Sequence, residues 1–187
     1  EYEPLLAAQG RVQTAMLGYS DSTKDGGYLA ASWALYSAQL QIHEAAARRG
    51  VQAVYFLGRG GGPAARSILS LPPHTVGGAI RTTEQGEVLA ARYDDRDIAF
   101  RHLEQITSAT FLVEAEKGQA PEDEWLEIMD FLAAEAYRAY RELVAADGFV
   151  EYFRQATPIA AIEDLPIGSR PARRNQAASL ANLRAIP

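Results

Sequence analysis

Two short apolar runs and one long segment of helical spacing organise the first third of the chain. Residues 12–20, "VQTAMLGYS", and residues 51–57, "VQAVYFL", are mostly apolar and are followed by turn-forming residues, which predicts two buried strands. Between them, residues 28–49 place large side chains three or four positions apart, and a helix brings such positions onto one face. The predicted face holds Leu29, Trp33, Tyr36, Leu40 and His43.

Both ends of this predicted helix carry boundary signals. Asp25 is the expected N-cap, because its carboxylate can accept hydrogen bonds from the first free backbone N–H groups. Arg48 and Arg49 followed by Gly50 are typical of a helix C-terminus.

The order of elements predicts an α/β fold. Residues 79–83 form a candidate third strand, and residues 96–115 and 121–146 are expected to form long helices. Strands that alternate with helices are expected to lie parallel, with right-handed crossovers. We therefore expect part of a helix-rich (β/α)₈ barrel. A complete barrel needs roughly 250 residues, so residues 1–187 are expected to form a single partial domain.

Composition and charge narrow the class of protein. The net charge of −6 and the pI near 5.1 argue against nucleic acid as the main partner. The absence of cysteine excludes disulfides and thiolate metal sites. No apolar run is long enough for a membrane span, and the first residues do not resemble a signal peptide. These features predict a cytoplasmic protein.

The segment "YSDSTKDGG", residues 19–27, is the first candidate for chemistry. Asp21 and Asp25 offer hard oxygen ligands for Mg²⁺ or Mn²⁺, and Lys24 between them could position an anion. In α/β folds such loops follow the carboxyl ends of strands, where ligands bind. The alternative is that these polar side chains only satisfy turn amides and cap the next helix.

A second candidate follows the second predicted strand. In "LGRGGGP", residues 57–63, Gly58 and Gly60 leave backbone N–H groups exposed for an anion, and Arg59 could grip phosphate or carboxylate with two hydrogen bonds. The loop lacks the Gly-Lys-Ser/Thr of a phosphate-binding P-loop and the third glycine of a dinucleotide fingerprint. A plain strand-to-helix connection remains the alternative.

The end of the chain is basic. No acidic residue occurs after Asp164, whereas four arginines do: Arg170, Arg173, Arg174 and Arg184. Such a segment is either a solvated end or a local site for a small anion.

Several of these stretches together resemble one family, phosphoenolpyruvate carboxylase. "MLGYSDSTKDGG" is similar to that family's M-[LI]-G-Y-S-D-S-x-K-D-[AG]-G motif. Further blocks match in the same order along nearly the whole chain, namely "GRGGGP", "SILSLPP", "IRTTEQGE", "YFRQATP", "GSRPARR" and "LRAIP". The resemblance implies a C-terminal catalytic part of a longer barrel enzyme, usually a homotetramer, which joins bicarbonate to phosphoenolpyruvate and gives oxaloacetate and phosphate.

The resemblance also implies roles for single residues. Asp21 would bind Mg²⁺ or Mn²⁺ together with a glutamate from an earlier segment, and Lys24 would be the catalytic lysine near the bicarbonate-derived group. Arg170 and Arg184 would surround the phosphate and carboxylate of the substrates. Arg59 would also help to bind an inhibitor, aspartate or malate. A non-catalytic fragment with a structural or oligomerisation role is the competing interpretation.

The chain departs from the family pattern at one place. The family reads F-H-G-R-G-G-[ST]-[VIL]-G-R-G-G-G-P, whereas Phe56 here runs directly into Leu57, Gly58 and Arg59. Six residues of the pattern have no counterpart, including a histidine and an arginine with catalytic roles in the family. Either they are deleted, which should abolish carboxylation, or they are missing only from the sequence as given.

Overall fold

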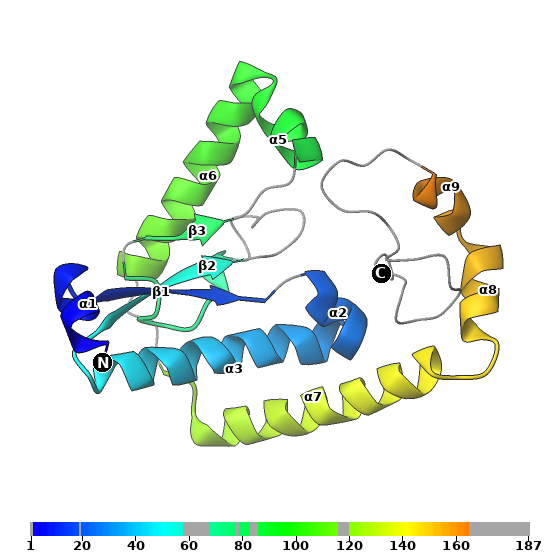
Figure 1. The fold of residues 1–187 in the computed structure, drawn as a ribbon, viewed down its shortest axis with the longest axis horizontal. Coiled ribbons are helices and arrows are strands. Elements are labelled where there is room, and N and C mark those ends of the chain that lie inside the picture. The colour runs from blue at the N-terminus through cyan, green and yellow to red at the C-terminus, as the bar shows by residue number, and fades with distance from the viewer. Residues whose placement is uncertain are drawn as a thin grey trace. The chain divides into compact units, whose positions relative to one another are not determined.

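The protein is represented by a computed structural model that describes residues 2–18, 20–57, 68–77, 79–82, 86–115 and 120–164 (Figure 1). Within these ranges, the side chains of residues 20, 21, 57, 82 and 86–88 are not described. The elements in chain order are α1 (Glu3–Ala8), β1 (Val12–Leu17), α2 (Ser20–Gly26), α3 (Tyr28–Ala47), β2 (Gln52–Leu57), β3 (Arg81–Thr82), α5 (Gly86–Tyr93), α6 (Arg96–Ala115), α7 (Asp123–Val144), α8 (Phe149–Ala156) and α9 (Ile159–Glu163).

The chain divides into two compact units. The first comprises Glu1–Ser20 and Ala34–Asp123, and the second comprises Asp21–Trp33 and Glu124–Pro187. The three strands all belong to the first unit. Helix α2, the start of α3, and helices α7 to α9 belong to the second.

The sheet of the first unit is small and parallel, with the order β1-β2-β3. Strands β1 and β2 pair from Val12 with Gln52 to Leu17 with Leu57. Strands β2 and β3 pair Leu57 with Thr82. The predicted strands and their parallel direction are therefore confirmed, and the described chain is a helix-rich α/β structure. Because all three strands run the same way, their carboxyl ends lie at one edge of the sheet.

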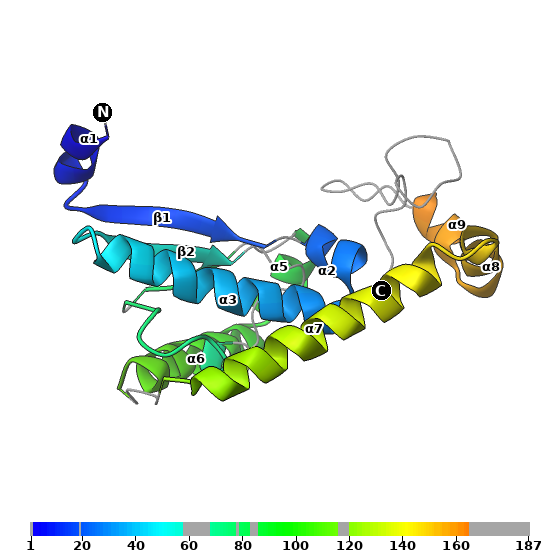
Figure 2. The ribbon, with the colours of Figure 1, turned by 90° about the horizontal axis from the view of Figure 1, so that it is seen from below.

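Helix α3 covers one face of this sheet (Figure 2). The buried side chains of Leu17, Ala53 and Tyr55 form the sheet's part of the core. Four residues of α3 pack against them, namely Leu35, Ala38, Ile42 and Ala46.

The residues predicted to share one face of α3, from Leu29 to His43, are not the ones that pack against the core of the sheet. Helix α3 is rich in apolar residues on several sides, so spacing alone did not single out one face. Small residues at 38 and 46 fit where the helix approaches the strands, whereas Leu29 remains 39% exposed.

Strand β1 is less buried than its composition predicted. Gln13, Thr14 and Met16 are exposed, and Leu17 is its single buried residue. The physical reason is position: β1 is the edge strand of the described sheet and is paired only with β2.

The long helices lie close to their predicted bounds. Helix α6 coincides with the predicted 96–115, and α7 falls within the predicted 121–146. The Asp95 carboxylate accepts hydrogen bonds from the backbone N–H groups of Asp97 and Ile98, at 2.9 and 3.0 Å, which caps α6.

Helices α8 and α9 form a small cluster of their own. Phe153 and Ile159 are buried together. The guanidinium of Arg154 donates two hydrogen bonds to the carboxylate of Glu163, at 2.9 and 3.1 Å, and the Glu163 side chain is only 4% exposed. This bidentate ion pair fixes α9 against α8.

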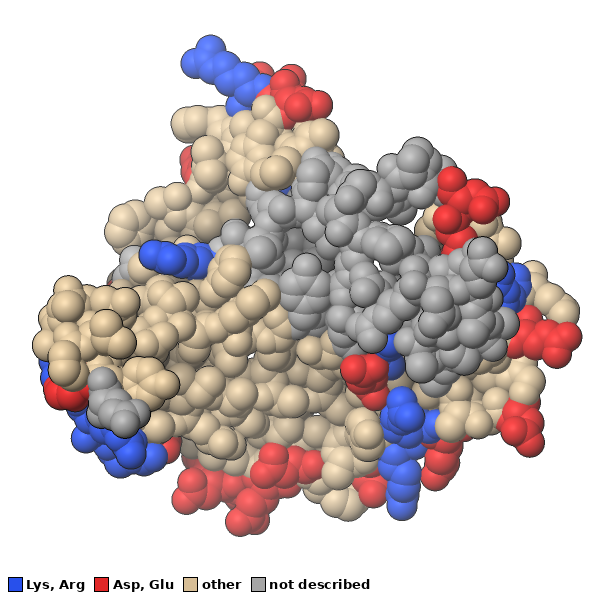
Figure 3. Space-filling model, viewed as in Figure 1, with Lys and Arg blue, Asp and Glu red and all other residues tan. Residues whose placement is uncertain are grey.

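Charge is mixed on one face of the described surface. On the face shown in Figure 3, the coloured lysine and arginine side chains lie in small groups interspersed with acidic ones. None of the helices in the described part of the chain combines the length and the apolar character needed to cross a membrane.

Candidate active site

Helix α2 carries the first candidate site residues and follows β1 directly in the chain. The link includes Gly18, whose φ of +69° is in the left-handed region. A Cβ atom at this position would lie 2.5 Å from Cδ2 of Leu35 in α3. Glycine is therefore required where the chain leaves β1.

Lys24 lies in the last turn of α2. Its side chain is only 10% exposed, and its Nζ lies 3.7 Å from Oδ1 of Asp25, whose own side chain is 71% exposed. The Lys24 side chain therefore lies largely buried beside the solvated carboxylate of Asp25, and its predicted catalytic role stays a prediction.

Asp25 does not cap α3, contrary to the prediction. It lies inside α2, and Gly27 separates the two helices with a φ of +77°. The N–H of Gly27 donates to the carbonyl of Thr23 at 2.7 Å, which completes the last turn of α2. The prediction failed because residues 20–26 form a helix of their own rather than a loop.

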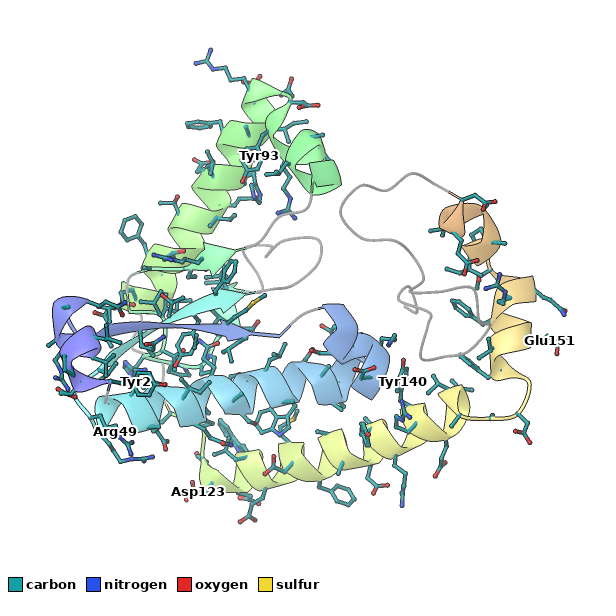
Figure 4. The ribbon with its side chains drawn as sticks, in the orientation of Figure 1. Tyr2, Arg49, Tyr93, Asp123, Tyr140 and Glu151 are labelled. Atoms are coloured by element: carbon teal, nitrogen blue, oxygen red, sulfur yellow. The ribbon has the colours of Figure 1, made fainter. Side chains whose placement is uncertain are left out.

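Helix α7 supports α2 and the start of α3 within the second unit. The hydroxyl of Tyr140, a residue labelled in Figure 4, donates a 2.6 Å hydrogen bond to the carbonyl oxygen of Lys24. The indole N–H of Trp33 donates to Oδ1 of Asp130 at 2.6 Å. The Tyr137 ring lies beside Gly26, 3.6 Å from the position that a Cβ there would take.

These contacts come from one face of α7. The contacting residues and two buried apolar residues, Ala133 and Val144, recur at alternating intervals of three and four positions. The full series is Asp130, Ala133, Tyr137, Tyr140 and Val144. Such spacing forms one continuous stripe along a helix. The backbone that carries Lys24 is therefore held by a face of α7 more than a hundred residues later in the chain.

The remaining predicted site residues are only partly covered by the description. Asp21 lies three residues before Lys24 in α2, a spacing that puts both on one side of the helix, but its side chain is not described. Gly58, Arg59, Gly60, Arg170 and Arg184 all fall outside the described residues. Their predicted roles stay predictions.

The donor set for a metal is incomplete among the described side chains. Over the described ranges, no three His, Asp or Glu residues come together as a metal site would require. Asp21 would contribute a single carboxylate, and one carboxylate does not hold a divalent cation by itself. A complete site would need ligands from outside this part of the chain.

Sequence reasoning missed Tyr140 and Gly27. Tyr140 is separated from Lys24 by 116 positions, so no local pattern connects the two. The stripe spacing along α7 was the one available signal, and it indicates a packed face without naming the partner. Gly27 was noticed only as part of a turn.

Comparison with known proteins gives a consistent result over the whole chain. The sequence model of the phosphoenolpyruvate carboxylase family matches residues 1–187. The chain is 50% identical to the phosphoenolpyruvate carboxylase of Nocardia farcinica and 47% identical to that of Mycobacterium leprae, each over 196 positions. It is also 47% identical to the enzyme of Roseiflexus castenholzii over 193 positions.

In each of these comparisons the whole of this chain is aligned, but it covers only 21% of the relative. The chain thus spans about a fifth of the length of the curated relatives it matches. The alignment with the Roseiflexus castenholzii enzyme extends over 193 positions, six more than the 187 residues here, so that relative has residues without a counterpart in this chain. On the match along its full length, the chain belongs to the phosphoenolpyruvate carboxylase family.

Proposed function

We propose that the protein to which this chain belongs carboxylates phosphoenolpyruvate with bicarbonate, giving oxaloacetate and phosphate, and that this chain supplies part of the active site. The observation that carries the proposal is the family match over residues 1–187. The described position of Lys24, largely buried on a helix that follows a parallel strand, supports it.

The proposal extends to the architecture of the parent protein. The three parallel strands and the α3 crossover support this proposal, because parallel strands joined by helices are what a (β/α)₈ barrel is built from. We infer that this segment belongs to such a barrel, in a cytoplasmic enzyme that assembles as a homotetramer. Its position within the catalytic C-terminal part of the enzyme is part of the same proposal.

Every species along the proposed reaction is anionic. Bicarbonate attacks the phosphorus of phosphoenolpyruvate, which forms carboxyphosphate and releases the enolate of pyruvate. Carboxyphosphate then yields CO₂ and phosphate, and the enolate carbon attacks CO₂ to give oxaloacetate. Lys24 would hold the bicarbonate-derived group, because a desolvated ammonium stabilises nearby negative charge more strongly than one in bulk water.

Arginines would provide the remaining positive charge. We assign Arg170 and Arg184 to the phosphate and carboxylate of the substrates, since a guanidinium binds either group through two parallel hydrogen bonds. Gly58, Arg59 and Gly60 would bind a substrate or an inhibitory dicarboxylate such as aspartate or malate through backbone N–H groups and the Arg59 side chain.

A divalent cation, Mg²⁺ or Mn²⁺, is the proposed cofactor, with Asp21 as a ligand from this chain. Such a cation, when bound, supplies positive charge next to a developing enolate oxygen. Asp21 precedes Lys24 by one helical turn, so α2 would present a carboxylate to the cation and an ammonium to the substrate anion from one side.

The test is Lys24→Ala in the complete enzyme. Oxaloacetate formation is followed by its reduction with NADH and malate dehydrogenase, and we expect the rate to fall by roughly a hundredfold or more, as on removal of a group that stabilises transition-state charge. Arg48→Ala removes an exposed cation at the end of α3 and should leave the rate unchanged. A near-normal rate for Lys24→Ala, with both variants folded, would contradict the role of Lys24.

A second candidate function is favoured by the coverage of the relatives. At about a fifth of their length, this polypeptide alone would be a non-catalytic fragment with a structural or oligomerising role. Intact mass spectrometry decides what the sample contains. A mass near 20.4 kDa with no carboxylation supports the fragment, whereas a mass several times larger with carboxylation supports the complete enzyme.

A further inference from the structure

Tyr140 is the described residue that fixes the backbone of Lys24. Its hydroxyl hydrogen donates to the Lys24 carbonyl oxygen at 2.6 Å, in a partly buried position. Lys24 belongs to the last turn of α2, where carbonyl groups lack N–H donors from their own helix. The neighbouring Thr23 carbonyl is taken by the N–H of Gly27. Tyr140 therefore donates a hydrogen bond to a carbonyl at the end of α2.

The Tyr140 ring is seated on the turn between α2 and α3. A Cβ on Gly27 would lie 2.9 Å from Cγ, 3.1 Å from Cβ and 3.2 Å from Cδ2 of Tyr140. Such close approach is available only because position 27 has no side chain. The ring and the hydroxyl thus hold two adjacent points of the chain, the turn at Gly27 and the carbonyl of Lys24.

The chemistry of Tyr140 suits a permanent donor. Burial raises the pKa of the Tyr140 phenol, with Asp25 acting in the same direction and Arg141 opposing it. The phenol therefore remains protonated near neutral pH, and its hydrogen bond to Lys24 does not depend on pH in that range.

We infer that Tyr140 is a positioning residue for Lys24, which keeps the Lys24 ammonium at one place by fixing the backbone from which it extends. This inference rests on the proposed function of Lys24. A side chain with four rotatable bonds loses precision quickly if its backbone moves, and misplacement by about 1 Å can cost roughly a hundredfold in rate. Tyr140 would act through Lys24 without touching substrate.

The variant that tests the inference is Tyr140→Phe in the complete enzyme. It removes the hydroxyl and keeps the ring against Gly27, so the fold should survive. The matched control is Tyr137→Phe, on the same face of α7, because the Tyr137 side chain is half-exposed and its hydroxyl makes no hydrogen bond to a described residue. Both variants lose one phenol oxygen from the surroundings of α2.

Two readouts are needed. The first is steady-state kinetics: Tyr140→Phe should lower kcat about three- to tenfold with the KM for phosphoenolpyruvate within twofold, as expected for one lost neutral hydrogen bond acting on the reacting geometry. The second does not depend on activity. It is the rate at which Lys24 reacts with an amine-acylating reagent, followed by peptide mass spectrometry, with Lys117, the other lysine of this chain, as internal reference.

Lys24 acylation should be several-fold faster in Tyr140→Phe than in Tyr137→Phe, with Lys117 unchanged. Equal acylation and equal kcat in the two variants would overturn the inference. A lower kcat with unchanged Lys24 acylation would also overturn it, because the effect would then bypass Lys24. If Lys24→Ala keeps a normal rate while Tyr140→Phe raises acylation, the positioning contact is real and the catalytic role of Lys24 fails.

Discussion

Gly27 offers the sharpest test of how α2, α3 and α7 are packed. Replacing it with alanine forces an L-residue into a φ of +77°, which costs about 1–2 kcal/mol. The new Cβ would also lie 2.9 Å from Cγ of Tyr140, and such overpacking costs about 1–3 kcal/mol. The two contributions predict a local destabilisation of about 2–5 kcal/mol for Gly27→Ala.

Gly148→Ala is the matched control. Gly148 has a φ of +80°, but nothing lies within 4 Å of the position of its Cβ. It therefore carries only the backbone cost of about 1–2 kcal/mol. Tyr140→Ala combined with Gly27→Ala should recover the steric part and leave the backbone part, because the two positions are in direct contact.

The assay is amide hydrogen exchange of the complete enzyme, read by mass spectrometry in peptides that span each turn. Local opening governs this exchange, and each 1.4 kcal/mol changes the rate about tenfold. We expect exchange near residue 27 to become roughly 30-fold faster or more in Gly27→Ala, and exchange near residue 148 to rise by about 5- to 30-fold in Gly148→Ala. Similar increases in both variants, or no rescue by Tyr140→Ala, would refute the close packing of Tyr140 on this turn.

Three further outcomes follow from buried polar groups. Thr75→Val should destabilise the protein by about 1–3 kcal/mol, because the Gln39 amide donates a buried 2.6 Å hydrogen bond to Thr75 Oγ1. The thermal midpoint of unfolding should therefore fall, and an unchanged midpoint would contradict this. Burial raises the pKa of Tyr55 to about 12. Its unfolded pKa is near 10, so the folded state retains the proton longer and stability should fall as pH rises from about 10 to 12; ultraviolet titration should show a late tyrosinate that Tyr55→Phe lacks. Glu163→Gln should speed amide exchange in α9 by roughly tenfold, because it weakens the two charge-assisted hydrogen bonds from Arg154; unchanged exchange would mean that the pair does not hold α9.

The elements of this chain were more predictable from sequence than their contacts. Residues 52–57 form a strand because their composition and the following turn formers leave few alternatives, and α6 has a clear start at Asp95. The residues of α3 that pack on the sheet could not be identified from the sequence, because apolar residues surround most of that helix. A one-dimensional pattern states that a residue is apolar, but it does not state which neighbour will cover it.

The candidate site shows the same division. Lys24 and Asp21 were identified because they lie in a polar segment after a predicted strand and match a family motif, and the structure places both in α2 rather than in a loop. Tyr140 escaped notice because its partner is a backbone carbonyl 116 positions away. A carbonyl has no sequence signature, since every residue has one, so a long-range contact to the main chain can be found only in three dimensions.

The register of β1 with β2 has a consequence for the order of folding during synthesis. Every pair in this ladder, from Val12 with Gln52 to Leu17 with Leu57, joins residues forty positions apart. At roughly 5–20 residues per second on a ribosome, about 2–8 s separate the appearance of the two strands. During that interval the described element that can cover Leu17 is α3, whose Leu35 and Ala38 pack against the same cluster. We therefore expect α3 to cover the nascent strand before its hydrogen-bonding partner is synthesised, so that the sheet would close onto this helix.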